Sequence, residues 1–199
     1  MKRVKPIILI SLALSSILSS SAQKQPGSFT RSVIIKTNVL NLVALKPSIS
    51  VEKPLADDLS IEGSFVQGKF NNFFFTDHYD YSGVAIRVKK YLSPVNAGNI
   101  YPYVALYTGT LRRNIQTQGH VDNTGWFGFS SRDFKSQSIR SGASLGLLYY
   151  SKNKIIIDGQ SSLGYGRYIN LDNNNPNTRF KGFLDIQLWL SVGYCLTYK

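Results

Sequence analysis

The segment 184–198 alternates with a period of two residues, and this alternation constrains the fold more than any other feature of the chain. One set of positions is apolar throughout and comprises Leu184, Ile186, Leu188, Leu190, Val192, Tyr194, Leu196 and Tyr198. The positions between them are small or polar, apart from Trp189. This period predicts a β-strand and excludes an amphipathic helix, whose period is about 3.6. At about 3.3 Å per residue and about 40° of tilt, the strand rises roughly 35–40 Å, enough to cross a lipid bilayer.

The same alternation recurs along the chain. It is found at 32–39, 46–53, 59–68, 84–89, 100–113, 139–149 and 155–165. With 184–198 these segments make eight predicted strands, and an even number suits closure by antiparallel up-and-down pairing. We therefore predict one all-β domain built as an eight-stranded antiparallel up-and-down barrel.

The connections between the predicted strands alternate in length. Segments 54–58, 93–99 and 151–153 are short, whereas 69–80, 114–136 and 170–179 are long. The connection at 41–45 is short where a long one is expected. Barrels of the bacterial outer membrane have short periplasmic turns and longer external loops. The alternation therefore predicts that the long connections share the external end.

The N-terminal segment has the parts of a secretion signal. Basic residues within 2–5 precede an apolar stretch at 7–18 and small residues at 19–22. We expect cleavage near Ala22, because Ser20 and Ala22 suit the −3 and −1 positions of a signal-peptidase site. The alternative is an uncleaved anchor, for which the apolar stretch is short. The predicted division is a signal peptide at 1–22, a lead-in at 23–30 and the barrel at 31–199.

Alternation reveals two faces but not which face is inside, so a soluble, periplasmic, lipocalin-like ligand-binding barrel is an alternative. Tyrosines near predicted strand ends favour a membrane barrel with aromatic girdles: Tyr91, Tyr101, Tyr103, Tyr149, Tyr150, Tyr165, Tyr168, Tyr194 and Tyr198. The polar face carries charges of both signs that could neutralise one another in a narrow lumen, among them Lys36, Glu52, Glu62, Arg87, Asp158 and Asp185. We therefore predict a transmembrane β-barrel, with Leu188 and Leu190 facing lipid and Gln187 and Trp189 facing the lumen.

Several of these strands resemble those of a known group. Segments 35–40 (IKTNVL), 46–52 (KPSISVE) and 59–63 (LSIEG) resemble K-T-N-L-L, P-N-x-x-x-E and S-L-E-x-x-G strands, and 83–91 and 101–109 resemble two later ones. The group is a family of small Gram-negative outer-membrane barrels of unknown function, similar more widely to OmpX/OmpA-like eight-stranded domains. Segment 67–70 (QGKF) departs from the family pattern, which has an aromatic N-P-W element there. The resemblance implies a fold and an outer-membrane location, but no activity.

An outer-membrane enzyme acting on lipid A or phospholipid is a further alternative. Hydrolysis or acyl transfer needs a nucleophile beside a base, commonly Ser and His with an orienting acid. The chain has only two histidines, His78 and His120, and both are predicted to lie in loops. Neither has the spacing of a metal site, and the lone Cys195 excludes both an internal disulfide and a site of several thiolates. We predict no catalytic residue and no cofactor, and expect Cys195 to be an inert buried thiol.

The chain is basic, with 23 Lys and Arg against 11 Asp and Glu. Secretion argues against nucleic acid as the partner. Basic residues instead gather at the predicted external end: Arg112, Arg113, Arg132, Lys135, Arg140, Arg167, Arg179 and Lys181. We expect six of them to contact lipopolysaccharide phosphates, namely Arg112, Arg113, Arg132, Lys135, Arg179 and Lys181. The alternative is that they are solvated rim charges.

The long connection at 114–136 contains the apolar cluster Trp126, Phe127 and Phe129 in a polar context. It could anchor to the membrane surface, plug the lumen, bind an external partner or pack onto the barrel's own rim. The resulting functional hypothesis is a non-enzymatic integral outer-membrane protein that is structural or presents its loops for surface interaction. Its expected partners are outer-membrane lipid and lipopolysaccharide, the barrel-assembly machinery during insertion, and an external protein or glycan. Side chains should fill the lumen, so free passage of solutes is not expected.

Overall fold

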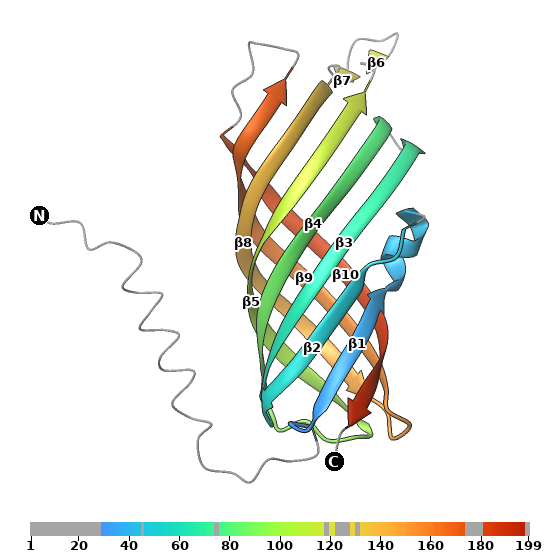
Figure 1. Cartoon of the computed structure of the whole chain (residues 1–199), viewed down its shortest axis with the longest axis vertical. Coiled ribbons are helices and arrows are strands. Elements are labelled where there is room, and N and C mark those ends of the chain that lie inside the picture. Colours follow the sequence, from blue (N-terminus) through green and yellow to red (C-terminus); the bar gives the residue numbers. More distant parts are fainter. Residues whose placement is uncertain are drawn as a thin grey trace, which may run out of the picture.

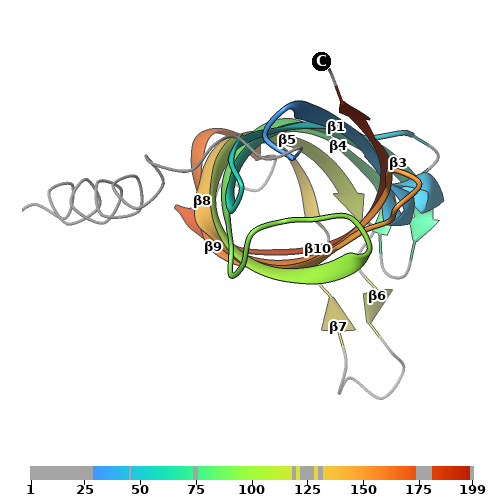
Figure 2. The same cartoon turned by 90° about the horizontal axis from the view of Figure 1, so that it is seen from below.

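The computed structural model describes residues 29–197 except 45, 74–75, 118–119, 122–127, 130–131 and 174–180. Eight antiparallel strands close into one barrel in the order β1-β10-β9-β8-β5-β4-β3-β2, as Figure 1 and Figure 2 show. The predicted fold class is therefore confirmed. None of the helical residues in the described ranges belongs to a helix long and apolar enough to cross a membrane.

The barrel strands are β1 (Ser32–Asn38), β2 (Ile49–Ala56), β3 (Leu59–Phe73), β4 (Thr76–Tyr91), β5 (Asn99–Thr117), β8 (Arg132–Tyr150), β9 (Ile155–Asn173) and β10 (Gly182–Thr197). A short 3-10 helix, η1 (Val39–Ala44), follows β1. The small ribbon of β6 (His120–Val121) and β7 (Gly128–Phe129) projects beyond one end of the barrel (Figure 1). The chain enters and leaves the barrel at the opposite end (Figure 1).

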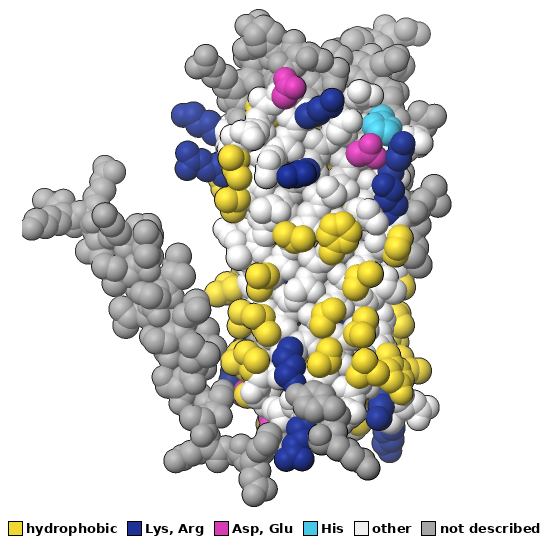
Figure 3. All heavy atoms as spheres, in the orientation of Figure 1, with side chains coloured by type: hydrophobic (Ala, Val, Ile, Leu, Met, Phe, Trp, Pro, Cys, Tyr) yellow, Lys and Arg dark blue, Asp and Glu magenta, His cyan; other side chains and the backbone are white. Residues whose placement is uncertain are grey.

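The two faces of each strand are assigned as the alternation predicts. Leu188 is 69% exposed and Leu190 40%, whereas Gln187 and Trp189 are each 8% exposed. The same division runs along β4, where Val84, Ile86 and Val88 point outward and Arg87 and Lys89 are fully buried. The apolar side chains form a belt around the outside of the barrel (Figure 3).

Five strand ends extend into the three long predicted connections. Most of 69–80 is strand, since β3 runs to Phe73 and β4 begins at Thr76, and the ends of 114–136 and 170–179 are also strand. These segments mix polar and apolar residues on both faces, as with Phe70 and Phe73 of β3, so they lose the regular alternation of a half-buried strand. Their backbones nevertheless continue the ladder, as in the pair Lys69 and Asp80. The prediction of long loops was therefore wrong at these ends, because hydrogen-bonded pairing does not require an apolar face.

The tyrosines divide between the two faces instead of forming one external girdle. Tyr91, Tyr101, Tyr103 and Tyr150 are buried inside the barrel, together with Phe29, Ile34, Leu148, Ile156 and Cys195. Tyr149, Tyr165 and Tyr194 are exposed on the outside, and Tyr198 lies outside the described residues. The girdle prediction was wrong for the buried four, because strand parity and not nearness to a strand end decides which way a ring points. These rings close the lower end of the lumen.

The first hairpin is much shorter than the others. β1 pairs with β10 only from Ser32 opposite Thr197 to Asn38 opposite Ser191. β2 pairs with β3 only up to Ile49 opposite Phe65. Above these points, β3 and β10 have no strand neighbour on this side within the described part of the chain (Figure 1). The barrel wall therefore stops partway between them.

Candidate functional site

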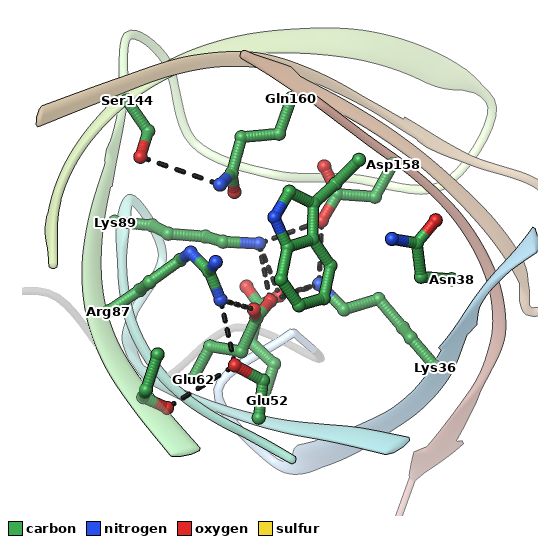
Figure 4. Close-up of polar contacts among 12 residues, drawn as sticks. Lys36, Asn38, Glu52, Glu62, Arg87, Lys89, Ser144, Asp158 and Gln160 are labelled. Atoms are coloured by element: carbon green, nitrogen blue, oxygen red, sulfur yellow. Dashed lines mark hydrogen bonds and ion pairs between the residues drawn. The ribbon is translucent and has the colours of Figure 1, made fainter. Parts of the chain in front are cut away.

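Six charged side chains meet in the middle of the lumen, and we call them the ion cluster: Lys36, Glu52, Glu62, Arg87, Lys89 and Asp158 (Figure 4). They come from strands β1, β2, β3, β4 and β9, all at inward-facing positions. Strand register places Glu52 directly opposite Glu62, and Glu62 directly opposite Arg87. Like charges directly opposite on neighbouring strands are destabilising. The two lysines therefore have to compensate for the glutamate pair.

Each ammonium of the cluster contacts the same three carboxylates. The Nζ atom of Lys36 is 2.6 Å from Glu52, 2.5 Å from Glu62 and 2.6 Å from Asp158. The corresponding distances from the Nζ atom of Lys89 are 3.0, 2.7 and 2.7 Å. An ammonium has three donors, so three carboxylate partners satisfy it. Arg87 adds a third positive charge, 3.1 Å from Glu62, and the cluster is thus balanced.

The three carboxylates also have the spacing of a metal site. One oxygen from each of Glu52, Glu62 and Asp158 lies within 4.8 Å of the others. The positive charge that they need is supplied by Lys36 and Lys89, whose Nζ atoms contact the same oxygens. The arrangement is therefore electrostatically complete through the chain's own side chains, and we assign it a structural role.

Neutral donors complete the shell of the cluster. Glu52 accepts hydrogen bonds from the hydroxyls of Ser60 and Tyr91, each at 2.5 Å. Tyr103 donates to Asp158 at 2.7 Å. The guanidinium of Arg87 lies 4.4 Å from the centre of the Trp189 ring, which covers the cluster from above. This packing leaves the centre of the lumen filled by side chains, as expected for a barrel of this size.

A second group of charges, the upper chamber, lies on the other side of Trp189. A cavity of about 310 Å³ is lined there by Arg113, Arg140, Asp185, Gln187 and Trp189, among others. Arg140 is 3.5 Å from Asp185, which already accepts hydrogen bonds from Tyr107 at 2.8 Å and Gln187 at 2.6 Å. The prediction that Arg140 belongs to the external rim was wrong, because its position in β8 points inward and it is only 5% exposed.

The predicted lipopolysaccharide contacts separate in the structure. Arg112 and Lys135 are exposed on the neighbouring strands β5 and β8, whereas Arg113 turns inward. Arg113 lies 3.8 Å from the centre of the Phe183 ring and donates to the hydroxyl of Tyr168 at 3.2 Å. All three line an open hollow of about 650 Å³ near the upper strand ends. Consecutive residues of a strand face opposite ways, so Arg112 and Arg113 approach this hollow from different faces of β5.

The remaining predicted contacts are only partly described. Lys181 is exposed just before β10. Arg132 and Phe129 belong to β8 and β7, but their side chains lie outside the described part of the structure. Arg179, Trp126 and Phe127 lie outside the described residues altogether.

Of the two histidines, only His78 has described side-chain contacts. His78 lies in β4 and not in a loop; its ring nitrogens contact Asn71 at 2.8 Å and Asp80 at 2.7 Å. Both nitrogens are therefore engaged, and neither contact is a nucleophile. His120 lies in β6, and its side chain is not among those described.

The sequence alone assigns neither Lys89 nor Arg140 a contact inside the lumen. Lys89 lies in the predicted strand 84–89 without an assigned partner, and Arg140 is among the basic residues predicted at the external end. The alternation of strand faces indicates that both residues point into the lumen. Lys89 lies on the same face of its strand as Arg87, and Arg140 lies on the same face as Ser144. Their partners come from distant strands, and no spacing along the sequence indicates them.

The chain was compared with known proteins at the level of families, sequences and structures. No protein-family model matches it, and the search of curated proteins also found no match. Among solved structures, it is similar to Neisserial surface protein A (NspA), with 15% identity, a TM-score of 0.47, and coverage of 84% of this chain and 94% of the other. It is also similar to Ail, the attachment invasion locus protein of Yersinia pestis, with 14% identity, a TM-score of 0.42, and coverage of 83% and 94%.

Matches at this level concern the overall fold. The strand order itself establishes the eight-stranded barrel. The proposed function therefore rests on the side chains of this chain.

Variants of two adjacent lysines, Lys89 and Lys90, test how much the ion cluster contributes to the stability of the barrel. Lys89→Met should lower the free energy of unfolding by about 3–5 kcal/mol, because it leaves buried carboxylates short of a partner. Lys90→Met is the matched control, since Lys90 lies on the outer face in a partly exposed pair with Asp58 and should change stability by less than about 1 kcal/mol. Urea unfolding of the refolded barrel in detergent measures both variants. Equal losses would show that the cluster does not stabilise the barrel.

Proposed function

We propose that the protein is a non-enzymatic, integral barrel of the bacterial outer membrane. The observation that carries this proposal is the polarity of the barrel, which has charges inside and apolar side chains outside. Leu184, Ile186 and Leu188 are 64–69% exposed on the outer face, while the ion cluster is buried. A soluble protein rarely exposes so large a continuous apolar surface. A lipocalin-like barrel requires the opposite arrangement, with an apolar interior for its ligand.

The exposed apolar belt includes residues of every barrel strand. Its members include Ile35, Val51, Ile61, Phe65, Val84, Ile86, Leu106, Leu145, Leu147, Ile157, Leu163 and Leu188. A closed barrel can present such a belt to hydrocarbon because its backbone groups are paired between strands. The belt lies nearer the end with the short turns, and polar strand ends extend beyond it at the other end (Figure 3).

These polar strand ends suggest the orientation and the role. Short turns at 57–58 and 151–154 suit the periplasmic side, and the longer strands β5, β8 and β9 suit the external side. The barrel would then hold the connections that include 118–131 and 174–180 above the membrane. We propose that this external end presents a surface to lipopolysaccharide and to an external protein or glycan, after insertion by the barrel-assembly machinery.

Three positions near this end are arranged for contact with anionic head groups. Arg112, Lys135 and Lys69 are exposed and line the hollow of about 650 Å³. Arg pairs well with phosphate through its planar fork, and Lys acts as a point charge. Lipopolysaccharide phosphates are the proposed ligands, and Arg112 and Lys135, exposed on neighbouring strands, are the pair chosen for the test.

The first prediction concerns location. The mature protein should sediment with the outer membrane, resist carbonate extraction and migrate differently on a gel when it is not heated. Recovery as a soluble periplasmic protein without detergent would contradict the proposal and favour a ligand-binding barrel.

The second prediction tests which face meets lipid. Leu188→Arg should cost about 2–4 kcal/mol of folding free energy in lipid, because it places a charge in the apolar belt. Gln116→Arg is the matched control, since Gln116 is exposed near the polar end of β5. Refolding yields and urea unfolding in phospholipid vesicles measure both. A larger loss for Gln116→Arg would show that the belt has been misplaced.

The third prediction concerns lipopolysaccharide. The double variant Arg112→Gln, Lys135→Gln should co-purify with less lipopolysaccharide per folded barrel, and high salt should lower the amount further for the parent protein. The control is Lys152→Gln, Lys154→Gln, which removes the same charge from exposed positions in the opposite turn. Equal retention by the parent, the double variant and the control at both salt concentrations would mean that Arg112 and Lys135 are solvated rim charges.

A further inference from the structure

Above the first hairpin, β3 and β10 are not hydrogen-bonded to each other and leave a lateral gap, and η1 (Val39–Ala44) borders this gap in contact with both strands. Segment 182–190 of β10 and segment 66–73 of β3 lie above the short first hairpin. Eight residues of strand correspond to roughly 25 Å of edge. An asparagine side chain binds each strand where its backbone pairing stops. On β10, the Oδ1 atom of Asn38 accepts a hydrogen bond from the Leu190 N–H at 3.3 Å. On β3, the side-chain amide of Asn41 donates a hydrogen bond to the Gln67 carbonyl at 2.7 Å.

The edge of β10 directs backbone groups into this gap. Leu190 points its N–H toward Asn38, and alternate residues of a strand direct their N–H and C=O groups to the same side. The N–H and C=O groups of Leu188 and Ile186 therefore also face the gap. The side chains of these two residues are among the most exposed apolar ones, at 69% each. In the proposed orientation, this edge lies at the depth of the apolar belt, where unpaired backbone groups are costly.

The upper chamber lies directly behind the gap. Its lining includes Asn38, Asn41 and Val66 on one side of the opening and segment 184–189 of β10 on the other. Arg113 and Arg140 also line it. A single cavity of about 310 Å³ thus joins the lateral opening to two guanidinium groups. This volume is near the lower limit for ligand pockets and suits a head group, not a whole lipid.

Charge is unbalanced in the upper chamber. The ion cluster below it has as many cations as carboxylates, whereas the lining of the upper chamber contains Arg113 and Arg140 but only one carboxylate, Asp185, which contacts Arg140. Arg140 is 5% exposed, and its Nε atom is buried with no partner among the described residues. The Nε atom of Arg113 is in the same state. Buried donors without acceptors are costly, and an anion would supply the missing acceptors.

We propose that the upper chamber binds the anionic head of a single-chain amphiphile whose apolar chain leaves through the lateral gap. Arg113 and Arg140 contact the carboxylate or phosphate of the head, and the chain lies along Leu188 and Ile186 at the edge of β10. The inference rests on the proposed membrane location, because the gap opens toward hydrocarbon only in that case. It goes beyond that proposal by assigning the barrel a ligand site and an entry route from the bilayer.

Trp189 reports on this site, since it lines the chamber and is shielded from the outside of the barrel. The chain has two tryptophans, so Trp126→Phe leaves Trp189 as the only source of tryptophan fluorescence. The probe is 9,10-dibromostearate, whose bromines quench a nearby indole. In detergent-refolded barrel carrying Trp126→Phe, the probe should quench Trp189 saturably. The uncharged dibromostearyl alcohol should quench it weakly and without saturation.

Different variants test the head-group site and the lateral entry route. Arg113→Gln should raise the half-saturating probe concentration about tenfold, the loss of one charged hydrogen bond. Arg113→Lys should retain most of the binding, and Arg167→Gln, which removes an exposed charge from the outer face, should leave it unchanged. Val66→Trp, read by displacement of a radiolabelled stearate, should block the chamber without altering either arginine. Each variant is first shown to be folded by its unheated gel mobility.

The outcomes distinguish this inference from the proposed function. Competition by lysophosphatidate or by stearate identifies the phosphate or the carboxylate as the preferred head group. A barrel that inserts into the outer membrane but shows quenching without saturation, or equal quenching in Arg113→Gln and Arg167→Gln, would overturn the ligand site alone. A soluble protein would overturn the proposed function, whatever the quenching shows.

Discussion

Six charges can be buried inside this barrel because each lysine of the ion cluster reaches all three carboxylates at once. Lys36 and Lys89 lie between Glu52, Glu62 and Asp158, and the third cation, Arg87, contacts Glu62. The cost of removing six ions from water is offset only if nearly every donor and acceptor has a partner. The cluster therefore fixes which strand faces are internal. Since the other face is apolar, the same constraint turns the outside of the barrel into a surface that suits hydrocarbon.

The short first hairpin leaves the wall incomplete in the upper half of the barrel. It supplies Lys36 and Glu52 to the cluster and then ends at Asn38 and Ile49, so the wall is complete around the cluster and incomplete above it. The cluster with Trp189 then acts as a floor, and the unbalanced arginines above it lie in the part of the lumen that the gap reaches. The side chains that fill the lumen block passage of solutes along the barrel axis. The proposed lateral gap nevertheless connects the upper chamber with the space beside the barrel.

Much of the fold follows from the sequence, because a period of two is a local property. The strand faces were predicted correctly from 184–198 and 84–89, and the lumen charges were recognised as a mutually neutralising set. The extended ends of β3, β4, β5, β8 and β9 were not, since these segments mix polar and apolar residues on both faces and show no regular alternation. The pairing within the ion cluster also remained hidden, because it depends on which strands meet across the lumen. The inward turn of Arg140, in contrast, follows from strand parity. The short connection at 41–45 was visible, but its consequence, the gap, depends on where β1 stops pairing with β10 and where β2 stops pairing with β3.

The central claim is that the barrel has a charged interior and a lipid-facing exterior, and a spin-label scan of β10 tests it most directly. Single cysteines would be placed at each position of 184–192 in a Cys195→Ser background, labelled and reconstituted in phospholipid vesicles. The account predicts that accessibility to molecular oxygen peaks at 184, 186, 188, 190 and 192, with low accessibility to a water-soluble nickel reagent at these sites. Peaks of nickel accessibility at the same even positions would contradict it, because the apolar face would then meet water.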